Sequence, residues 1–199
     1  EIRRTGLTFA PESGERLRRQ VGKGMSDDAL RAHALAARAA GWRQIKLYFM
    51  IGLPDETEAY LDEACRLIAG ISRIITVRAA FNTFVPKAHT PLERSPFLPR
   101  EEYLYRRGFI RSRLKSNRFV TLSFHPWEMS CIEALLGRGG PALGGVIARA
   151  WALGAKMENW REGFAFERWE QALQQEGLDL AALSREQEQA VLPWHFIRV

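Results

Sequence analysis

The stretch Gln44-Ile-Lys-Leu-Tyr-Phe-Met-Ile-Gly-Leu-Pro-Asp55 decides how the rest of the sequence is interpreted. Residues 44–51 form a nearly continuous apolar run, which is typical of a strand covered on both faces of a parallel sheet. Gly52 and Pro54 then end the strand, because glycine tolerates unusual backbone torsions and proline fixes the exit of a loop. The stretch therefore predicts a buried strand whose carboxyl end leads into a tight loop.

Helices and further strands alternate around this stretch. Short apolar runs predict strands at residues 7–10 and 74–83, and helical spacing of apolar residues predicts helices at about 15–21, 26–41 and 56–70. This order indicates βα units and a parallel sheet. Three strands are too few to close an eight-stranded barrel, so they form either half of a barrel or part of an open sheet.

A cluster of prolines between Pro86 and Pro99 marks a change of region. The sequence beyond it predicts a short strand at 119–124 and otherwise helices, at about 100–115, 127–136, 140–153 and 166–177. Five of the six tryptophans lie in this part, which indicates a second core. We therefore expect two domains, residues 1–98 and residues 99–199.

Composition indicates a soluble globular protein. Of the 199 residues, 46% are hydrophobic and 26% are charged, and no apolar run approaches the ~18 residues that a membrane span needs. The formal charge of +6 allows nucleic acid or an anionic cofactor as a partner. Solvated charged faces of an arginine-rich protein are the plainer explanation, because no dense basic run is present.

The cysteines indicate the cellular compartment, and the start of the chain indicates its extent. Cys65 and Cys131 are too few and too far apart for a disulfide framework or a zinc site, and both fit small buried hydrophobes. A reducing cytoplasm is the expected compartment. The chain opens on Glu1 without methionine, lacks a signal peptide and soon enters an apolar strand, so we expect it to be a piece of a longer protein.

Ligands of parallel α/β folds sit at the carboxyl ends of the strands, so the residues after each predicted strand are the site candidates. In the loop at 52–57, Gly52 would let backbone approach a flat ligand ring, and Glu56 would anchor the loop. A turn with helix-capping chemistry is the structural alternative. Glu12 is suited to accept hydrogen bonds from ribose hydroxyls or an amino group, with a salt bridge to Arg16 as its structural alternative.

Other signatures of catalysis are weak. His89 and His125 are far apart in the sequence, and no carboxylate pairing supports a Ser/His/Asp triad or a metal site built from them. No Walker loop or dinucleotide fingerprint is present. An unrelated barrel hydrolase that uses Glu12, Glu56 or His89 stays an alternative on these residues alone.

Taken together, the three strand ends resemble the later half of the radical SAM enzymes, and among them the bacterial cobalamin-binding-domain-like proteins of unassigned substrate. The likeness lies in Leu7-Thr-Phe-Ala-Pro-Glu-Ser-Gly-Glu-Arg-Leu-Arg18, Ile45-Lys-Leu-Tyr-Phe-Met-Ile-Gly-Leu-Pro-Asp-Glu-Thr57 and Phe84-Val-Pro-Lys-Ala-His-Thr-Pro-Leu92. It continues over essentially the whole chain, through Leu122-Ser-Phe-His125, Val146-Ile-Ala-Arg-Ala-Trp-Ala-Leu-Gly154 and Leu192-Pro-Trp194.

The resemblance implies an α/β fold in which this chain is the C-terminal half of a partial (β/α)6 TIM-like barrel, followed by a mainly helical region. It implies S-adenosyl-L-methionine as cofactor, with ribose or methionyl contacts at the end of the first strand. The family's adenine-packing motif Gly-x-Ile-x-Gly-x-x-Glu becomes Tyr48-x-Met50-x-Gly52-x-x-x-Glu56 here, with Tyr48 for the first glycine, Met50 for the isoleucine and one residue inserted. The cofactor-binding residues so implied are Glu12, Ser13, Met50, Ile51, Gly52, Leu53, Glu56, Phe84, Val85 and Pro86.

One departure from the family limits what the chain can do. The family holds a 4Fe-4S cluster on a Cys-x-x-x-Cys-x-x-Cys loop after its first strand, and two cysteines 66 positions apart cannot form that loop. The resemblance therefore implies part of an oxidoreductase that is inactive alone. Its partner would be the missing N-terminal half-barrel, from the same gene or a separate chain. The substrate and any dependence on cobalamin stay open.

A second class of function fits the net positive charge. The basic, tryptophan-containing region from Arg100 onward would dock RNA or a protein partner, as a binding module derived from such an enzyme. Nothing in this region resembles a known RNA-binding motif. A steep salt dependence of RNA binding would favour this function, whereas an upstream reading frame with the three-cysteine loop would favour the radical SAM function.

Overall fold

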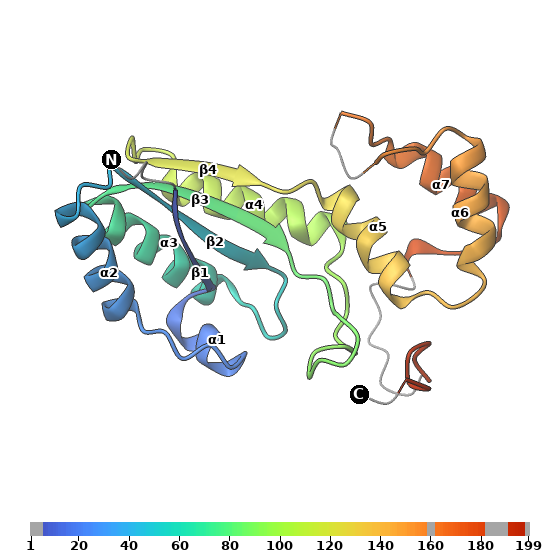
Figure 1. Ribbon diagram of the computed structural model, residues 1–199, viewed down its shortest axis with the longest axis horizontal. Helices are drawn as coiled ribbons and strands as arrows, with labels where there is room; N and C mark the ends of the chain where they lie inside the picture. The colour runs from blue at the N-terminus through green and yellow to red at the C-terminus, as the bar shows by residue number, and fades with distance from the viewer. Residues whose placement is uncertain (1–5, 159–161, 182–190, 198–199) are drawn as a thin grey trace. The chain divides into compact units, whose positions relative to one another are not determined.

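The structure is a computed structural model that describes residues 6–158, 162–181 and 191–197. Four parallel strands form one sheet in the order β1-β2-β3-β4, with the bounds Leu7–Glu12, Gln44–Ile51, Thr76–Thr83 and Val120–Phe124 (Figure 1). The described residues also form seven helices: α1 Glu15–Gln20, α2 Asp27–Ala39, α3 Glu58–Ser72, α4 Arg100–Leu114, α5 Trp127–Arg138, α6 Leu143–Ala152 and α7 Phe166–Gln175. The predicted α/β class is confirmed. No helix in the described ranges combines the length and the apolar character that a membrane crossing requires.

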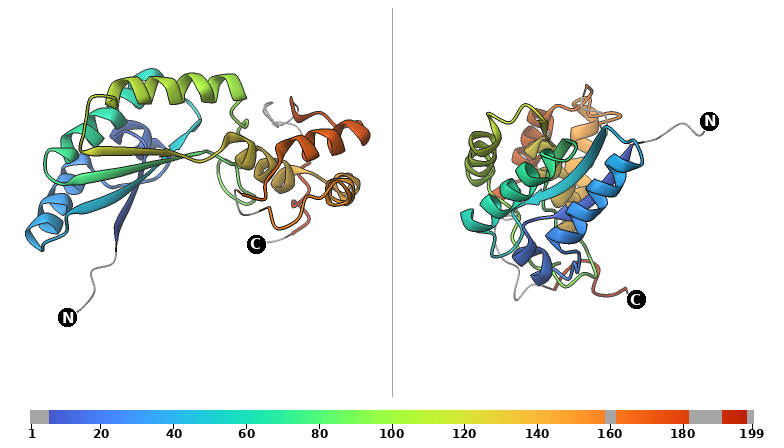
Figure 2. Two further views of the ribbon diagram at one scale, coloured as in Figure 1. Left: turned by 90° about the horizontal axis from the view of Figure 1, so that it is seen from above. Right: turned by 90° about the vertical axis from the view of Figure 1, so that its left-hand side faces the viewer.

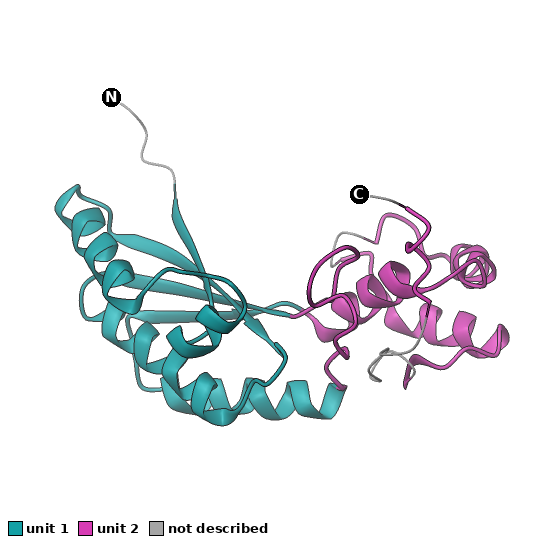
Figure 3. Ribbon diagram, turned by 90° about the horizontal axis from the view of Figure 1, so that it is seen from below, with its two compact units in different colours: residues 1–83, 100–125 teal, residues 84–99, 126–199 magenta. Residues whose placement is uncertain are grey.

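The chain forms two compact units (Figure 3). The first comprises the described residues of 1–83 and 100–125, and it holds the sheet with α1 to α4. The second comprises those of 84–99 and 126–199, and it holds α5, α6 and α7. Segment 100–125 therefore groups with the sheet, whereas the sequence-based boundary after residue 98 assigns it to the helical region.

The sheet has four strands, one more than the three that the sequence assigns to it. β4 pairs in parallel with β3, with Val77 opposite Val120 and Phe81 opposite Phe124. The sequence predicts the strand itself but not its pairing, because the proline-rich segment 84–99 belongs to the second unit and interrupts the βα pattern. Helix α4 then returns the chain to the sheet, where Figure 2 shows it running alongside the strands.

Helices cover one face of the sheet, and the opposite face is only partly covered. Along β2 the exposure alternates: Ile45 and Phe49 are 1% exposed, whereas Lys46, Tyr48 and Met50 are half-buried. The prediction that both faces are covered was therefore wrong, because tyrosine and methionine on the open face made the stretch look continuously apolar. Right-handed βα connections between strands in consecutive order put every crossover helix on the same face.

Aromatic side chains form the centre of the covered face. Phe49, Phe81 and Phe124 occupy paired positions on β2, β3 and β4, and their rings stack with centroids 5.1 Å and 5.2 Å apart. The guanidinium groups of Arg107 and Arg111 on α4 each lie 5.4 Å from the centroid of the Phe124 ring. These contacts lock the strand register, so the strand ends share a common edge.

The second unit has an aromatic core of its own. The indole N–H of Trp127 donates a hydrogen bond to the carbonyl of Leu98 at 2.8 Å. The same indole ring packs against Phe97 and Phe166, at centroid distances of 5.8 Å and 6.0 Å. Helix α5 thereby joins the end of the proline-rich segment 84–99 to the start of α7.

Candidate ligand-binding site at the carboxyl edge of the sheet

The carboxyl ends of the parallel strands lie along one edge of the sheet, and the predicted site residues of the first unit gather there. Ile51, the last residue of β2, pairs with Thr83, the last residue of β3. Glu12 ends β1 and pairs with Phe49, after a shift of register that begins at Phe9. The loops after β1 and β2 are therefore neighbours at this edge.

Glu12 leaves β1 in a left-handed backbone conformation, with φ at 67°. A residue with a side chain adopts that conformation at a cost of roughly 1–3 kcal/mol, which its surroundings must offset. Its carboxylate oxygen Oε1 accepts a hydrogen bond from Nζ of Lys23 at 3.1 Å, and the side chain is 13% exposed. The alternative of a salt bridge to Arg16 was wrong, because Arg16 pairs with Glu63.

A buried arginine that the sequence alone did not mark holds the loop after β1. The side chain of Arg18 is fully buried. Its guanidinium donates to the carbonyls of Pro11, Ser13 and Met25 at 2.9, 2.9 and 2.6 Å, and to Oδ1 of Asp27 at 2.9 Å. In the sequence, this residue is indistinguishable from the exposed arginines of the same short helix. The clamp fixes the backbone on both sides of the β1 end, where Ser13 is 2% exposed.

The loop after β2 is closed by Glu56. Gly52 has φ at 89°, a conformation that glycine adopts without penalty, and its N–H donates to Oε2 of Glu56 at 2.8 Å. Arg106 on α4 donates from Nη1 to the same oxygen at 2.6 Å. One carboxylate oxygen thus ties the strand end to its loop and to a helix 50 residues further along the chain. Glu56 anchors the loop as the sequence indicates, but nothing in the sequence pointed to Arg106 as its partner.

The edge holds hydrogen-bonding capacity that the described residues do not use. Oε1 of Glu56 and Oγ1 of Thr83 are both buried, and neither has a hydrogen-bond partner in the described part of the chain. Burial raises the pKa of the Glu56 carboxyl, against the lowering effects of the Gly52 N–H and of Arg106. Buried polar atoms of this kind are normally satisfied by an ordered water or by a polar group of a ligand.

The other predicted residues of β2 and its loop differ in what they can offer a ligand. Met50 is half-buried on the open face of the sheet, whereas Ile51 is fully buried in the covered core and Leu53 is 5% exposed. A ligand at this edge would therefore meet the Met50 side chain and the backbone around Gly52.

The third predicted segment follows β3 directly but belongs to the second unit. Phe84 and Pro86 are buried, and Val85 is half-buried. Their predicted role, to flank the adenine or the substrate, stays a prediction.

The two histidines singled out in the sequence make hydrogen bonds through their backbone atoms. The backbone N–H of His89 donates to Oε2 of Glu93 at 2.9 Å, and the indole N–H of Trp194 donates to the same oxygen at 2.7 Å. These bonds, that of Trp194 foremost, lower the pKa of Glu93 to about 2. The carbonyl of His125 accepts a hydrogen bond from the Tyr103 hydroxyl at 2.9 Å.

Neither cysteine is placed for metal or redox chemistry. Cys65 on α3 and Cys131 on α5 are buried free thiols in different units. Burial raises the pKa of each thiol to about 12, which keeps both protonated at neutral pH. In the ranges that the structure describes, no group of three or more His, Cys, Asp and Glu side chains is arranged to hold a metal ion.

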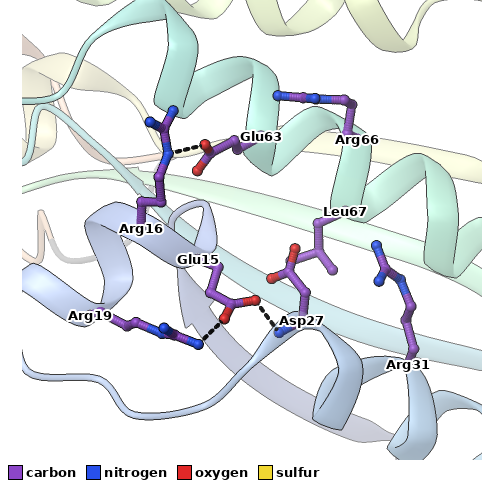
Figure 4. Close-up of a pocket in the computed structure, with 8 residues that line it drawn as sticks. All are labelled: Glu15, Arg16, Arg19, Asp27, Arg31, Glu63, Arg66 and Leu67. Atoms are coloured by element: carbon purple, nitrogen blue, oxygen red, sulfur yellow. Dashed lines mark hydrogen bonds and ion pairs between the residues drawn. The ribbon is translucent and has the colours of Figure 1, made fainter.

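A cavity of about 400 Å³ opens between α1, α2 and α3, and its charges are matched within the protein (Figure 4). The backbone N–H of Asp27 donates to Oε2 of Glu15 at 2.8 Å, which is the main reason why the pKa of Glu15 is lowered. Every lining arginine pairs with a carboxylate: Arg16 with Glu63, Arg19 with Glu15, Arg31 with Asp28 and Arg66 with Asp62. This cavity therefore joins the three helices and leaves little charge for a ligand.

The chain is similar to an uncharacterized protein of the archaeon Methanocaldococcus jannaschii. The two are 36% identical over 93 residues, which make up 46% of this chain and 21% of the archaeal protein. The chain thus matches about a fifth of the length of this curated relative. No family model matches the sequence, and no solved structure matches it.

Proposed function

We propose that this chain is the later half of a partial barrel and supplies the adenosine-side edge of an S-adenosylmethionine site in a radical SAM enzyme. The observation that carries the proposal is the sheet: four parallel strands in consecutive order, with helices on one face and a partly covered opposite face. A doubly wound sheet reverses its strand order and covers both faces. A sheet wound in one direction is the arrangement found in α/β barrels.

The open face has the mixed character expected of a barrel interior that lacks its other half. It carries Lys46, Tyr48 and Met50 on β2, with Arg78 and Asn82 opposite Lys46 and Met50 on β3. Lys46 and Arg78 are like charges at directly paired positions, which destabilise an isolated sheet. A second half-barrel, from the same gene or from another chain, would cover this face and supply counter-charges. The much longer archaeal relative has the length for such a half.

The residues at the carboxyl edge fit the adenosine part of S-adenosylmethionine. Gly52, with φ at 89°, has no side chain to keep a flat ring from its backbone, and Met50 lies two residues before it on the open face. Glu12, which accepts a hydrogen bond from Lys23, has a carboxylate that can also accept hydrogen bonds from ribose hydroxyls, and Ser13 follows it in the chain. When bound with an iron-sulfur cluster, S-adenosylmethionine supplies radical chemistry. This chain's own part is to hold the adenosine and to keep water from it.

The residues present do not fit the 4Fe-4S cluster. Three thiolates are needed and the sequence has two cysteines, each buried in a different unit. We therefore propose that the chain is inactive alone. Formation of a four-iron cluster in the purified chain after reconstitution with iron and sulfide, together with release of deoxyadenosine, would overturn this part of the proposal.

Titration of the isotope-labelled chain with S-adenosylmethionine and S-adenosylhomocysteine, followed by NMR, tests the binding edge. We expect millimolar ligand to shift the amide signals of residues 12–14 and 50–56. Gly52→Val should abolish these shifts, because a β-branched side chain is strained at positive φ. Gly24→Val is the matched control, since the Gly24 Cβ would meet open space. Absent shifts at these amides, or an equal loss in the control, would refute the site.

A further inference from the structure

A second cavity opens at the opposite, amino edge of the sheet. It has a volume of about 830 Å³ and lies where β2 and β3 begin, bordered by the ends of α2 and α3 and by the turn before β4. Its lining includes three arginines, two aromatic side chains and an amide, namely Arg38, Arg43, Arg73, Trp42, Phe119 and Asn117. No aspartate or glutamate lines it. The cavity therefore combines positive charge with flat rings.

The positive charge of this cavity comes from three separate segments of the sequence, none of which is a dense basic run. Residues 29–54, 64–92 and 103–127 contain no aspartate or glutamate and together carry fourteen lysines and arginines. All three segments contribute to the amino edge, because helices of βα units run back against the strands and end there. The first turns of α2, α3 and α4, at the other end of these helices, carry acidic residues.

Two of the lining arginines are not used by the fold. Arg38 donates from Nη1 to the carbonyl of Ile74 at 2.5 Å, so it has a structural role. Arg43 and Arg73 are exposed, and in the described ranges neither side chain has a hydrogen bond or an ion pair. The cavity in Figure 4 differs in this respect, because each of its arginines pairs with a carboxylate.

One aromatic ring of the cavity lining, that of Phe119, is exposed next to a turn fixed by Asn117. Phe119 is 47% exposed, and the Arg118 guanidinium lies 4.8 Å from the centroid of its ring. Asn117 holds the turn: its Nδ2 donates to Oγ of Ser72 at 2.8 Å, and its Oδ1 accepts from the Phe119 N–H at 3.1 Å. An exposed ring next to unpaired arginines suits a base that stacks while its phosphates meet guanidinium groups.

We infer that this amino-edge cavity binds a single-stranded polynucleotide, with phosphates at Arg43 and Arg73 and a base stacked on Phe119. The inference does not depend on the proposed S-adenosylmethionine site, which lies at the other edge of the sheet. RNA and DNA share the chemistry invoked here, so matched strands of both distinguish the two sources.

Fluorescence anisotropy with a labelled 12-nucleotide RNA, the DNA of the same sequence and the RNA duplex tests the inference. Each probe is titrated with the full chain over a range of salt concentrations. We expect both single strands to bind more tightly than the duplex. Preference for RNA over DNA would identify RNA as the source, and equal affinity would identify single strands of either kind. Failure of both single strands to bind, or tighter duplex binding, would overturn the inference.

Variants locate the site and separate it from general charge effects. The double change R43E/R73E should weaken binding at least tenfold and reduce the slope of log K against log salt by about 1.4, the value for two phosphates on a single strand. R31E/R66E, in the charge-matched cavity of Figure 4, alters net charge equally and should change affinity less than twofold. Equal loss in both double variants would show non-specific attraction and refute the site.

Phe119→Ala tests the stacking part. We expect roughly a tenfold loss of affinity with an unchanged salt slope, since base stacking does not release counterions. An unchanged affinity would remove Phe119 from the site. Circular dichroism and thermal unfolding of every variant show whether the fold persists, so that a loss of binding is not confused with unfolding.

Discussion

The two edges of the sheet come from the same βα units but use their charges in opposite ways. At the carboxyl edge, the buried carboxylate of Glu56 meets Arg106, Glu12 meets Lys23, and the buried Arg18 satisfies four acceptors. At the amino edge, Arg43 and Arg73 stand exposed beside a cavity without carboxylates. Charges at the first edge hold the loops, whereas Arg43 and Arg73 at the second make no hydrogen bond or ion pair in the described part of the chain.

Part of this difference follows from helix stability alone. Acidic side chains favour the first turn of a helix and basic ones the last, because of the helix dipole. The acidic first turns of α2, α3 and α4 and the position of Arg73 at the C-cap of α3 fit this rule. Arg43 lies in the loop before β2, where no helix end needs it. The positive charge at the amino edge is thus larger than helix-dipole stabilisation alone explains.

Removal of Arg18 should have the largest effect on stability. Arg18→Met leaves Asp27 and three carbonyls without their donor in a buried site, so the free energy of unfolding should fall by about 4–5 kcal/mol. Urea unfolding measures the change. Arg19→Met is the control, because Arg19 is 66% exposed and its loss should cost less than about 0.5 kcal/mol. Equal effects would mean that the clamp does not hold the β1 loop.

Removal of Arg106 should come next and should depend on pH. Arg106→Met leaves the Glu56 carboxylate buried and unpaired, and should cost about 3 kcal/mol at neutral pH. The pKa of Glu56 is raised above its ordinary value of 4.5, so folding favours the protonated carboxyl. The stability gained from this protonation is complete below pH 4.5 and is lost as the pH rises through the folded-state pKa. The difference in free energy of unfolding between Arg106→Met and the native chain should therefore shrink toward pH 4.5.

Chemical denaturation of Arg106→Met at several pH values checks this expectation. The double variant E56Q/R106M has no carboxylate to titrate, so its deficit relative to the native chain should vary far less with pH. A deficit of Arg106→Met that stays constant from neutral pH to pH 4.5 would contradict the assignment of Glu56 as the group that is left unpaired.

Local patterns were sufficient to predict the secondary structure. The bounds 44–51 of β2 were predicted as observed, and the helix predicted from residue 26 is capped there, with Oγ of Ser26 accepting from the Ala29 N–H at 3.1 Å. Pairing across a long insertion was not predictable, because the link between β3 and β4 depends on Phe81 and Phe124 meeting in space. The same limit applies to coverage: a run of apolar letters does not tell which face of a strand the helices occupy.

The candidate site was predictable only in its local part. Gly52 and Glu56 lie four residues apart, so their hydrogen bond follows from a loop motif. Arg106 comes from 50 residues away, and Arg18 looks like any exposed helical arginine until the fold buries it. The amino-edge cavity was missed for a related reason, since its arginines are scattered and form no basic run.

A smaller effect is expected at the glycine of the carboxyl edge. Gly52→Ala places a side chain at φ of 89°, so the free energy of unfolding should fall by roughly 1–2 kcal/mol. Gly24→Ala, at a site with open space and without positive φ, should change it by less than about 0.5 kcal/mol. Thermal unfolding compares the two. A loss in the control as large as that in Gly52→Ala would show that the backbone conformation of Gly52 is not the cause.

A still smaller effect on stability is expected at the exposed aromatic ring of the amino edge. Phe119 is 47% exposed, so Phe119→Ala should lower the free energy of unfolding by less than about 1 kcal/mol. Phe81→Ala is the reference for a buried ring: Phe81 is 1% exposed in the aromatic stack, and its loss should lower the free energy of unfolding by about 3–5 kcal/mol. A stability loss at Phe119 close to that at Phe81 would mean that its ring serves the core. A stable Phe119→Ala protein that has lost its single-stranded ligand would show that this ring serves a partner and not the fold.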